Sequence, residues 1–221
     1  MRLFSSLSIR SGLVVTVLLA VLPALALQLT TGLEHRRHLE TEAKAEASRA
    51  AAAMAEVQER ITASTRLLLT ALAAMPELRI RDGPACSALL ASLLDQNPLY
   101  TNILAVDAKG DLFASALPFE RVNIADRKHF RDVMATRQFV AGEYLVSRTS
   151  GDPSFPFAMP ILDEAGQSAG VLVAAVKLDA LDAAFAKLRM PPEANLGLSD
   201  RNGTRLFYRP RNPANPVGSP I

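Results

Sequence analysis

Residues 156–178 read PFAMPILDEAGQSAGVLVAAVKL, two apolar runs joined by the short turn DEAG (163–166). Aspartate can accept hydrogen bonds from its own turn backbone, and glycine can adopt the positive φ that such a turn needs. The stretch therefore predicts an antiparallel hairpin. Its second run, 170–178, is apolar almost throughout, which is typical of a central strand that is covered on both faces.

The same unit occurs twice more along the chain. TNILAV (101–106) precedes the turn DAKG (107–110), and NLGLS (195–199) precedes the turn DRNG (200–203). Another apolar run follows each of these turns. We therefore expect three hairpins, in which the Asp-x-x-Gly turns are architectural.

Helical patterns surround these hairpins. The segment 31–75, rich in Ala, Glu and Arg and free of proline, predicts a long amphipathic helix, and 84–95 predicts a shorter one. IADRKHFRDVM (124–134) predicts a helix between the first two hairpins, and 181–188 predicts another before the third. The fold class is therefore α+β, an antiparallel sheet with helices on one side.

The long helix carries an apolar stripe, and at roughly 65 Å it is too long for one small domain to bury. We expect part of it to pack on a second copy of the chain, which would make a homodimer. The alternative is that the stripe covers only its own domain. The stripe residues recur at three- and four-residue spacing: Met54, Val57, Ile61, Leu68, Leu72 and Met75.

The N-terminus contains an uncharged segment, 11–29, preceded by Arg2 and Arg10. About 19 residues of helix reach roughly 28 Å, close to the thickness of the bilayer core. The positive-inside rule then keeps the N-terminus in the cytoplasm. The alternative is a cleaved signal peptide, because the sequence ALA at 24–26 resembles a cleavage site. Both interpretations place the rest of the chain outside the cytoplasm. The anchor predicts a protein of the bacterial inner membrane whose bulk is periplasmic.

Composition excludes several classes of function. The chain is 49% hydrophobic and has a net charge of only +2, so a packed core is expected and nucleic-acid binding is not. Cys86 is the single cysteine. It cannot form a disulfide within the chain, and the spacing of Cys and His residues does not suggest zinc.

The helix at 124–134 begins with unusual charges. Asp126 is expected to be its N-cap, with direct ligand contact as the alternative. Arg127 and Lys128 follow immediately, although positive charge in a first turn opposes the helix dipole. An anionic ligand bound at the helix start by Arg127 would explain this arrangement; a surface or structural ion pair would explain it equally well. Lys128 is expected to be solvated.

His129 has three interpretations: a structural hydrogen bond, a place in a pocket wall, or metal binding. Metal binding is disfavoured, because no second histidine or acidic cluster lies nearby at ligand spacing. His35 and His38 stand beside Arg36 and Arg37 and are expected to form a solvated face. We therefore predict neither a metal nor a cofactor, and no catalytic residue.

Three stretches resemble the double Cache (PDC-type) sensor domains of bacterial receptors. They are CSALLASLLDQNPLYTNILAVDAKGDLFASALP (86–118), IADRKHFRDVMATRQFVAGEYLVSRTSGDPSFPFAMPI (124–161) and GVLVAAVKL (170–178). The resemblance implies PAS-like modules that bind a small ligand such as an amino acid, carboxylate or amine. It also implies a cytoplasmic output domain, a histidine kinase or diguanylate cyclase. The implied organisation is a cytoplasmic N-terminus (1–10), a membrane anchor (11–29), a long signalling helix (30–82), a membrane-distal module (83–190) and the start of an incomplete membrane-proximal module (191–221).

The resemblance also suggests which residues border the ligand. The strand in VAGEYLVSR (140–148) would line the pocket, which makes Tyr144 and Arg148 candidates, on the same strand face as Val146. Phe157 is expected to be a core residue or a pocket wall, together with Phe155. Relatives often carry a cysteine where this chain has Ala114, so the partner thiol of Cys86 is missing. A buried free thiol is expected, with an intermolecular disulfide as the alternative.

Three functions follow from these observations. The leading one is the ligand-sensing input region of a transmembrane receptor, which is itself not an enzyme. The second is a structural or partner-binding module that has lost its ligand. The third is a membrane-anchored periplasmic hydrolase using Asp126, His129 and one of Ser147, Ser150 or Ser154, but the chain lacks the G-x-S-x-G elbow of such enzymes.

Overall fold

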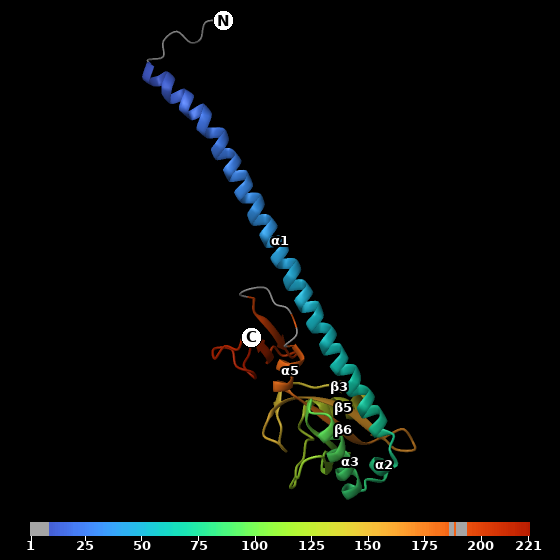
Figure 1. Cartoon of the computed structure of the whole chain (residues 1–221). Coiled ribbons are helices and arrows are strands. Elements are labelled where there is room, and N and C mark those ends of the chain that lie inside the picture. Colours follow the sequence, from blue (N-terminus) through green and yellow to red (C-terminus); the bar gives the residue numbers. More distant parts are fainter. Residues whose placement is uncertain (1–8, 186–187, 189–193) are drawn as a thin grey trace. The chain divides into compact units, whose positions relative to one another are not determined.

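The computed structural model describes residues 9–185, 188 and 194–221. The chain forms two compact units, Met1–Arg49 and Ala50–Ile221, and the sheet, the core and all cavities discussed below lie in the second. Figure 1 shows the elements in chain order. They are α1 (Ile9–Ala73), α2 (Pro76–Ile80), α3 (Gly83–Gln96), β1 (Tyr100–Asp107), β2 (Leu112–Ser115), α4 (Lys128–Thr136), β3 (Val140–Ala141), β4 (Leu145–Val146), β5 (Pro153–Leu162), β6 (Ser168–Lys177), α5 (Leu178–Phe185), β7 (Leu196–Ser199) and β8 (Arg205–Arg209).

Two predictions concern parts of the chain that the structure describes incompletely. The expected membrane anchor, 11–29, falls in α1, where most side chains lie outside the described residues. In the described part of the chain, none of the helices combines the length and apolar character needed to cross a membrane. The expected boundary between two modules, at 190–191, also lies outside the described residues.

All three predicted hairpins are confirmed. β1 pairs with β2, β5 with β6, and β7 with β8, each antiparallel. In every turn the aspartate side chain accepts backbone N–H groups within its own hairpin, and the glycine has a φ between 73° and 84°. The Asp-x-x-Gly turns are therefore architectural, as predicted.

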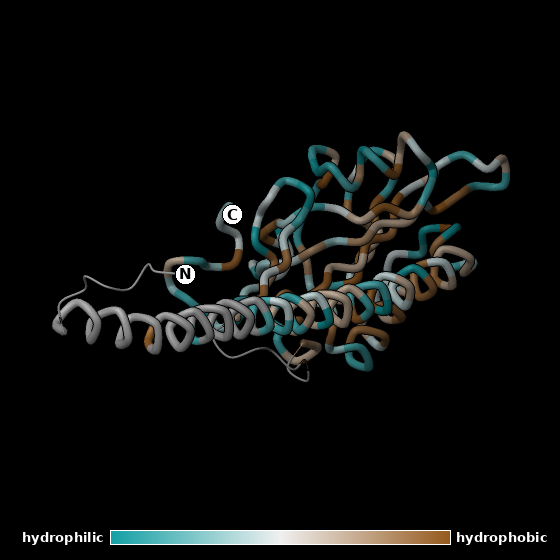
Figure 2. Tube along the Cα trace, turned by 90° about the horizontal axis from the view of Figure 1, so that it is seen from above, coloured by the Kyte–Doolittle hydropathy of each residue, from teal (hydrophilic) through white to brown (hydrophobic). Residues whose placement is uncertain are grey.

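The main sheet has the strand order β2-β1-β6-β5-β3, with β4 also paired to β5. β6 lies between β1 and β5, as its continuous apolar sequence predicts. Figure 2 shows apolar segments concentrated on these strands. The prediction of helices on one side only is wrong. Leu172 and Ala174 face a core shared with α1, α2, α3 and α5, whereas Val171 and Val173 face a second core under α4, because a strand that is apolar on both faces needs cover on both.

The apolar stripe of α1 packs within its own unit. Met54 and Leu72 are buried, and the four other stripe residues are half-buried against the same core. The alternative interpretation of the stripe, cover for its own domain, is thus the one that the structure supports. Leu67 lies on the opposite side of the helix and is 73% exposed. In Figure 1 the end of α1 runs alongside β3, β5 and β6.

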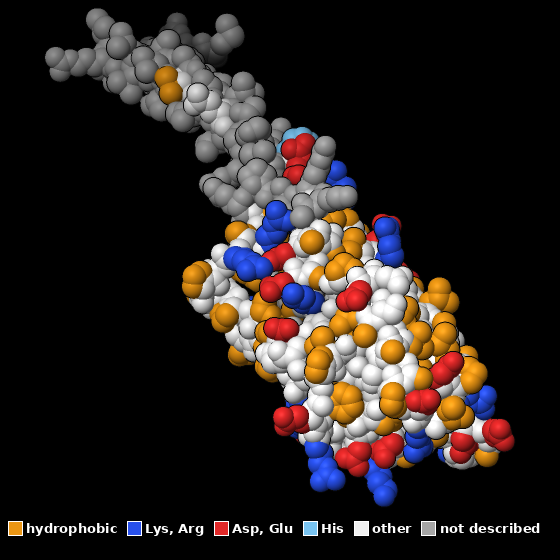
Figure 3. All heavy atoms as spheres, turned by 60° about the horizontal axis from the view of Figure 1, so that its bottom comes forward, with side chains coloured by type: hydrophobic (Ala, Val, Ile, Leu, Met, Phe, Trp, Pro, Cys, Tyr) orange, Lys and Arg blue, Asp and Glu red, His pale blue; other side chains and the backbone are white. Residues whose placement is uncertain are grey.

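Cys86 lies in the first core, in α3, with no exposed surface and no disulfide partner. Burial and the nearby Asp82 and Glu77 carboxylates raise the pKa of its thiol. The prediction of a buried free thiol is confirmed. On the face shown in Figure 3, acidic and basic side chains are interspersed with apolar ones, in keeping with a net charge of +2.

Candidate ligand site

A cavity of about 40 Å³ lies on the α4 side of the sheet. By a rule of about 10–15 Å³ per water, it has room for roughly three waters. Strands β1, β4, β5 and β6, helix α4 and the segments around 122–124 and 147–149 contribute its walls. The lining residues are Leu104, Val122, Ile124, His129, Leu145, Ser147, Arg148, Thr149, Pro156, Val173 and Ala175.

His129 is the most unusual residue of this wall. Its side chain is only 4% exposed, and among the described residues it makes no hydrogen bond or ion pair. Burial, reinforced by the positive charge of Arg127, lowers its pKa from 6.5 to about 4, so the imidazole is neutral at physiological pH. Its ring nitrogens are not among the fully buried side-chain atoms without a partner, which in the described residues are Ser168 Oγ and Arg205 Nε. They are therefore accessible, and His129 can act as a donor or acceptor for a ligand in the cavity.

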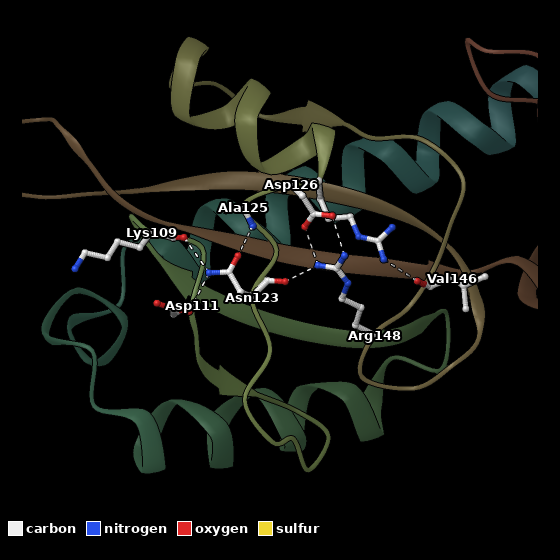
Figure 4. Close-up of polar contacts among 8 residues, drawn as sticks. Lys109, Asp111, Asn123, Ala125, Asp126, Val146 and Arg148 are labelled. Atoms are coloured by element: carbon white, nitrogen blue, oxygen red, sulfur yellow. Dashed lines mark hydrogen bonds and ion pairs between the residues drawn. The ribbon is translucent and has the colours of Figure 1, made fainter.

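Asp126 does not cap α4, so that interpretation is wrong. The N-cap position belongs to Arg127, which makes no side-chain capping bond, and the helix begins at Lys128. Asp126 instead forms a two-bond ion pair with Arg148, at 2.7 and 2.8 Å. This ion pair lowers the pKa of Asp126 and raises that of Arg148. Figure 4 shows the two side chains facing each other. The forked geometry of a guanidinium favours such a pair over a single cap bond.

Arg127 contributes a second guanidinium beside the first. It donates to the carbonyl of Val146 at 3.3 Å, and in the described part of the chain no carboxylate lies within ion-pair distance of it. Burial and the charge of Arg148 lower its pKa. Asp126 bonds only one of these two cations. Arg127, close enough to His129 to lower its pKa but not itself a lining residue of the cavity, therefore keeps a positive charge without a bonded counter-ion. Lys128, by contrast, pairs with Asp132 one turn along the helix.

The segment before α4 is held in place by a residue that sequence reasoning missed. The side-chain amide of Asn123 donates to the carbonyl of Lys109 and to Asp111, its side-chain oxygen accepts the N–H of Ala125, and its own carbonyl accepts from Arg148. Figure 4 shows these bonds linking the first hairpin turn to the ion pair. An Asn three residues before the expected N-cap Asp126 was the signal available in the sequence.

A buried polar network fixes the opposite wall. Asn102, fully buried in β1, donates to Ser115 at 2.9 Å and to Thr149 at 2.8 Å, and Thr149 also contacts the hydroxyl of Ser147. The expectation that Tyr144, Val146 and Arg148 share one strand face is wrong. β4 ends at Val146, and Ser147 opens a turn by bonding Asp152 and Gly151. A polar residue inside the apolar run TNILAV was the sequence signal for this network.

Tyr144 and Phe157 lie elsewhere. Phe157 belongs to the core on the α1 side, stacked on Phe139 and edge-on to Phe155. It lines a larger cavity of about 210 Å³ between α1, β5, α5 and the β7–β8 hairpin. Tyr144 is half-buried against the same core. The sheet therefore separates these two from Asp126, Arg127, His129 and Arg148, which the structure brings together.

We take the smaller cavity as the candidate site because His129 on its wall has no described hydrogen-bond partner and the neighbouring Arg127 has no bonded counter-ion. Its other walls are mainly apolar, whereas the larger cavity also has polar residues in its walls, among them Gln58, Thr62 and Asp200. Within the described residues, no group of three His, Cys, Asp or Glu side chains could hold a metal ion. The described residues also contain no hydrogen bond from His129 to Asp126 or to any serine, so they do not form a catalytic triad.

Known proteins share this architecture. Sporulation kinase D of Bacillus subtilis is 29% identical over 121 residues, 54% of this chain and 24% of that protein, so the chain spans about a quarter of its relative. The extracellular domain of the putative histidine kinase rpHK1S-Z16 has the same fold, with a TM-score of 0.66 and 21% identity over 76% of this chain and 71% of that one.

A third similarity is to the ligand-binding domain of the Pseudomonas aeruginosa amino-acid chemoreceptor PctC, solved in complex with GABA. Its TM-score is 0.55, with 19% identity over 74% of this chain and 73% of that one. Residues 34–216 match the family model described as Cache domain. That match covers most of the chain, and the resemblance noted in its sequence is confirmed: the chain belongs to the Cache domain family.

Proposed function

We propose that this chain is the extracytoplasmic, ligand-sensing input region of a bacterial transmembrane receptor. The observation that carries the proposal is His129, a buried, neutral and unpartnered imidazole on the wall of a small cavity beside a guanidinium without a bonded counter-ion. Membership of the Cache family, whose solved relatives include histidine-kinase and chemoreceptor domains, supports the same conclusion.

The chemistry of the cavity favours a small carboxylate, including an amino acid with a short side chain. One carboxylate oxygen would accept from Arg127, and the other would accept from the N–H of His129. Leu104, Val173 and Ala175 would contact the short apolar part. Arg148 would close the site while Asp126 holds it in place. The amino-acid chemoreceptor complexed with GABA supports this class of ligand.

The proposal extends to the rest of a receptor. The uncharged segment 11–29 would anchor the chain in the inner membrane, and the exposed side of α1 around Leu67 would pair two copies. The β7–β8 hairpin would open a second, membrane-proximal module. Ligand binding would shift the population of two arrangements of the sheet and α1, and a histidine kinase or diguanylate cyclase would read them out.

A thermal-shift screen tests the ligand proposal. A ligand present at a hundred times its dissociation constant stabilises a fold by about 2.7 kcal/mol, or roughly 5–10 °C for a domain of this size. We expect short carboxylates or amino acids to raise the melting temperature of the chain, and Arg127→Ala to abolish that shift without lowering the melting temperature itself.

Arg131→Ala is the matched control, because Arg131 is exposed on the same helix. It should keep the full ligand shift. A shift that survives in Arg127→Ala, or disappears equally in both variants, would contradict this account of the pocket.

A second candidate function rests on the small volume of the cavity and on the Asp126–Arg148 pair, which already satisfies one cation internally. These features favour a structural or partner-binding module that has lost its ligand. The absence of any shift across carboxylates, amino acids and amines, in a sample that unfolds cooperatively, would decide for this candidate.

A further inference from the structure

Residues 142–149, here called the strap, connect the larger cavity to the candidate ligand cavity. At one end, Gly142 donates its N–H to Pro156 and lines the larger cavity. At the other end, Ser147, Arg148 and Thr149 line the candidate ligand cavity. The strap leaves the sheet between β3 and β4, where Pro156 of β5 has no N–H to offer. It is therefore held there by other contacts.

Those contacts come from the third hairpin. The N–H of Tyr144, in the middle of the strap, donates to Oδ2 of Asp200 at 3.0 Å. The other oxygen of Asp200 accepts the N–H groups of Asn202 and Thr204 and forms the hairpin turn. Although burial alone would raise the pKa of Asp200, these hydrogen bonds hold it below its usual value. One carboxylate thus bonds the hairpin and the strap together.

Gly218 contacts the strap from a second side. A Cβ added at this position would lie 2.5 Å from the hydroxyl oxygen of Tyr144, so the tyrosine ring rests directly on the glycine backbone. The turn that contains Gly218 is itself bonded to β8, through the carbonyl of Arg205. Tyr144 is therefore enclosed between the turn of the hairpin at Asp200 and the turn after β8 that contains Gly218.

The strap also reaches the cations of the candidate site. The carbonyl of Val146 accepts from Arg127, and Arg148 bonds Asp126 and Asn123. A displacement of Tyr144 by the hairpin would move these groups, because only a few residues separate them along the chain. Coupling between two sites is reciprocal. If the hairpin positions the strap, a ligand that displaces the strap will also displace the hairpin.

We infer that Asp200 is a positioning residue for the candidate ligand cavity, acting through Tyr144, and that the β7–β8 hairpin and the cavity are thereby coupled. The inference gives the proposed sensor a route from its ligand to its third hairpin. Its regulatory meaning rests on the proposed function, but its physical content, the dependence of the strap on the hairpin, does not.

Amide hydrogen exchange of the full chain tests this coupling without any ligand. Asp200→Asn keeps one oxygen for the turn but places an NH2 group opposite the N–H of Tyr144, so only the bond to the strap is lost. We expect exchange at Ser147, Thr149 and Gly151, none of which Asp200 touches, to become about tenfold faster, as befits the loss of a hydrogen bond to a charged group.

The chain offers a matched control. Asp163→Asn changes the same Asp-x-x-Gly turn in the second hairpin, where the described hydrogen bonds of the aspartate remain within its own hairpin. It should leave exchange in the strap unchanged. Faster exchange confined to 196–209 in Asp200→Asn, with the strap unaffected, would overturn the inference.

Gly218→Ala provides a second approach that leaves Asp200 intact, in case Asp200→Asn unfolds the hairpin. Its control is Gly166→Ala, which has a similar positive φ of 73° but no described atom within 4 Å of the added Cβ. Gly218→Ala should accelerate exchange in the strap and Gly166→Ala should not; equal behaviour of the two would also overturn the inference. A failed ligand screen would leave either result intact, so the two proposals fail separately.

Discussion

At the scale of single residues, a local sequence rule predicted the wrong role for Asp126 at the start of α4, because a long-range contact determines it. Asp126 satisfies the rule for an N-cap, yet its carboxylate bonds Arg148, which lies 22 residues further along the chain. A cap rule considers only neighbouring backbone groups, so it cannot anticipate a distant guanidinium. The oddity of Arg127 was visible in the sequence, because a positive charge at a helix start is unfavourable regardless of the fold.

His129 was correctly singled out, but its environment was not predictable. A histidine near the start of a helix has no sequence feature that reports burial, and its 4% exposure arises because α4 packs against β3, β5 and β6. Pairing of distant strands decides that environment, and strand order cannot be read from one sequence.

The depressed pKa of His129 makes stability depend on pH. Between pH 6.5 and about pH 4 the unfolded chain takes up a proton at this histidine that the folded chain does not. The free energy of unfolding should therefore fall as the pH is lowered through this window, by about 3 kcal/mol in full, and be unaffected by His129 above pH 7. Urea denaturation of the wild type and His129→Gln at several pH values measures this contribution.

Carboxylates elsewhere also titrate in that range, so the difference between the two proteins is the quantity to compare. His129→Gln should lose less stability than the wild type between pH 7 and pH 4.5. Parallel pH curves for the two proteins would show that His129 does not titrate as described.

At the scale of elements, the hairpins could be predicted and their arrangement could not. Each Asp-x-x-Gly turn is set by residues four apart, so local sequence is sufficient. The position of α4 on its own face of the sheet depends on which strands neighbour β6, a long-range outcome. The apolar stripe of α1 predicted a buried face correctly, but periodicity does not say whether the partner surface belongs to the same chain.

Two leucines of α1 separate its buried and exposed sides. Leu69 is fully buried, and Leu67 is 73% exposed. Leu69→Ala should lower the free energy of unfolding by about 2–5 kcal/mol, since it leaves a cavity in the core. Leu67→Ala should change it by less than about 0.5 kcal/mol. Denaturant unfolding of the two variants, both Leu→Ala in one helix, measures the difference directly.

The exposed leucine also tests the proposed pairing of two chains. If α1 pairs copies through this side, the wild type should sediment as a dimer and Leu67→Glu as a monomer of unchanged stability. Equal sedimentation of both proteins would remove Leu67 from any dimer interface, and similar costs for the two alanine variants would contradict the packing of α1.

At the scale of the whole molecule, family membership was the most secure inference from sequence. Three separate stretches of the chain carried the resemblance, and the family match over 34–216 confirms it. Ligand identity was less accessible, because it depends on a few side chains around a cavity of about 40 Å³. Those side chains come from β1, β4, β5, β6, α4 and two connecting segments, and no single stretch of sequence contains them.

Of the two compact units, the second contains all the elements of the proposed coupling. Residues 50–221 hold the sheet and both cavities, and the strap links one cavity to the third hairpin. A ligand of a few heavy atoms could influence the hairpin only through such bonded segments, since direct contact is confined to the cavity wall. Coupling between the candidate ligand cavity and the β7–β8 hairpin therefore depends on the strap, residues 142–149, as well as on the ligand site.

The most direct test of the central claim is a pH titration of the chain labelled with ¹⁵N-histidine, followed by NMR. The chain has three histidines, and the signal that disappears in His129→Gln identifies the one in the cavity. The account predicts that His129 stays neutral down to about pH 4 without ligand, and that acetate, as the smallest carboxylate, raises its pKa by placing a negative charge beside the ring. A His129 signal that titrates near pH 6.5, or that responds to acetate no more than His35 and His38 do, would contradict it.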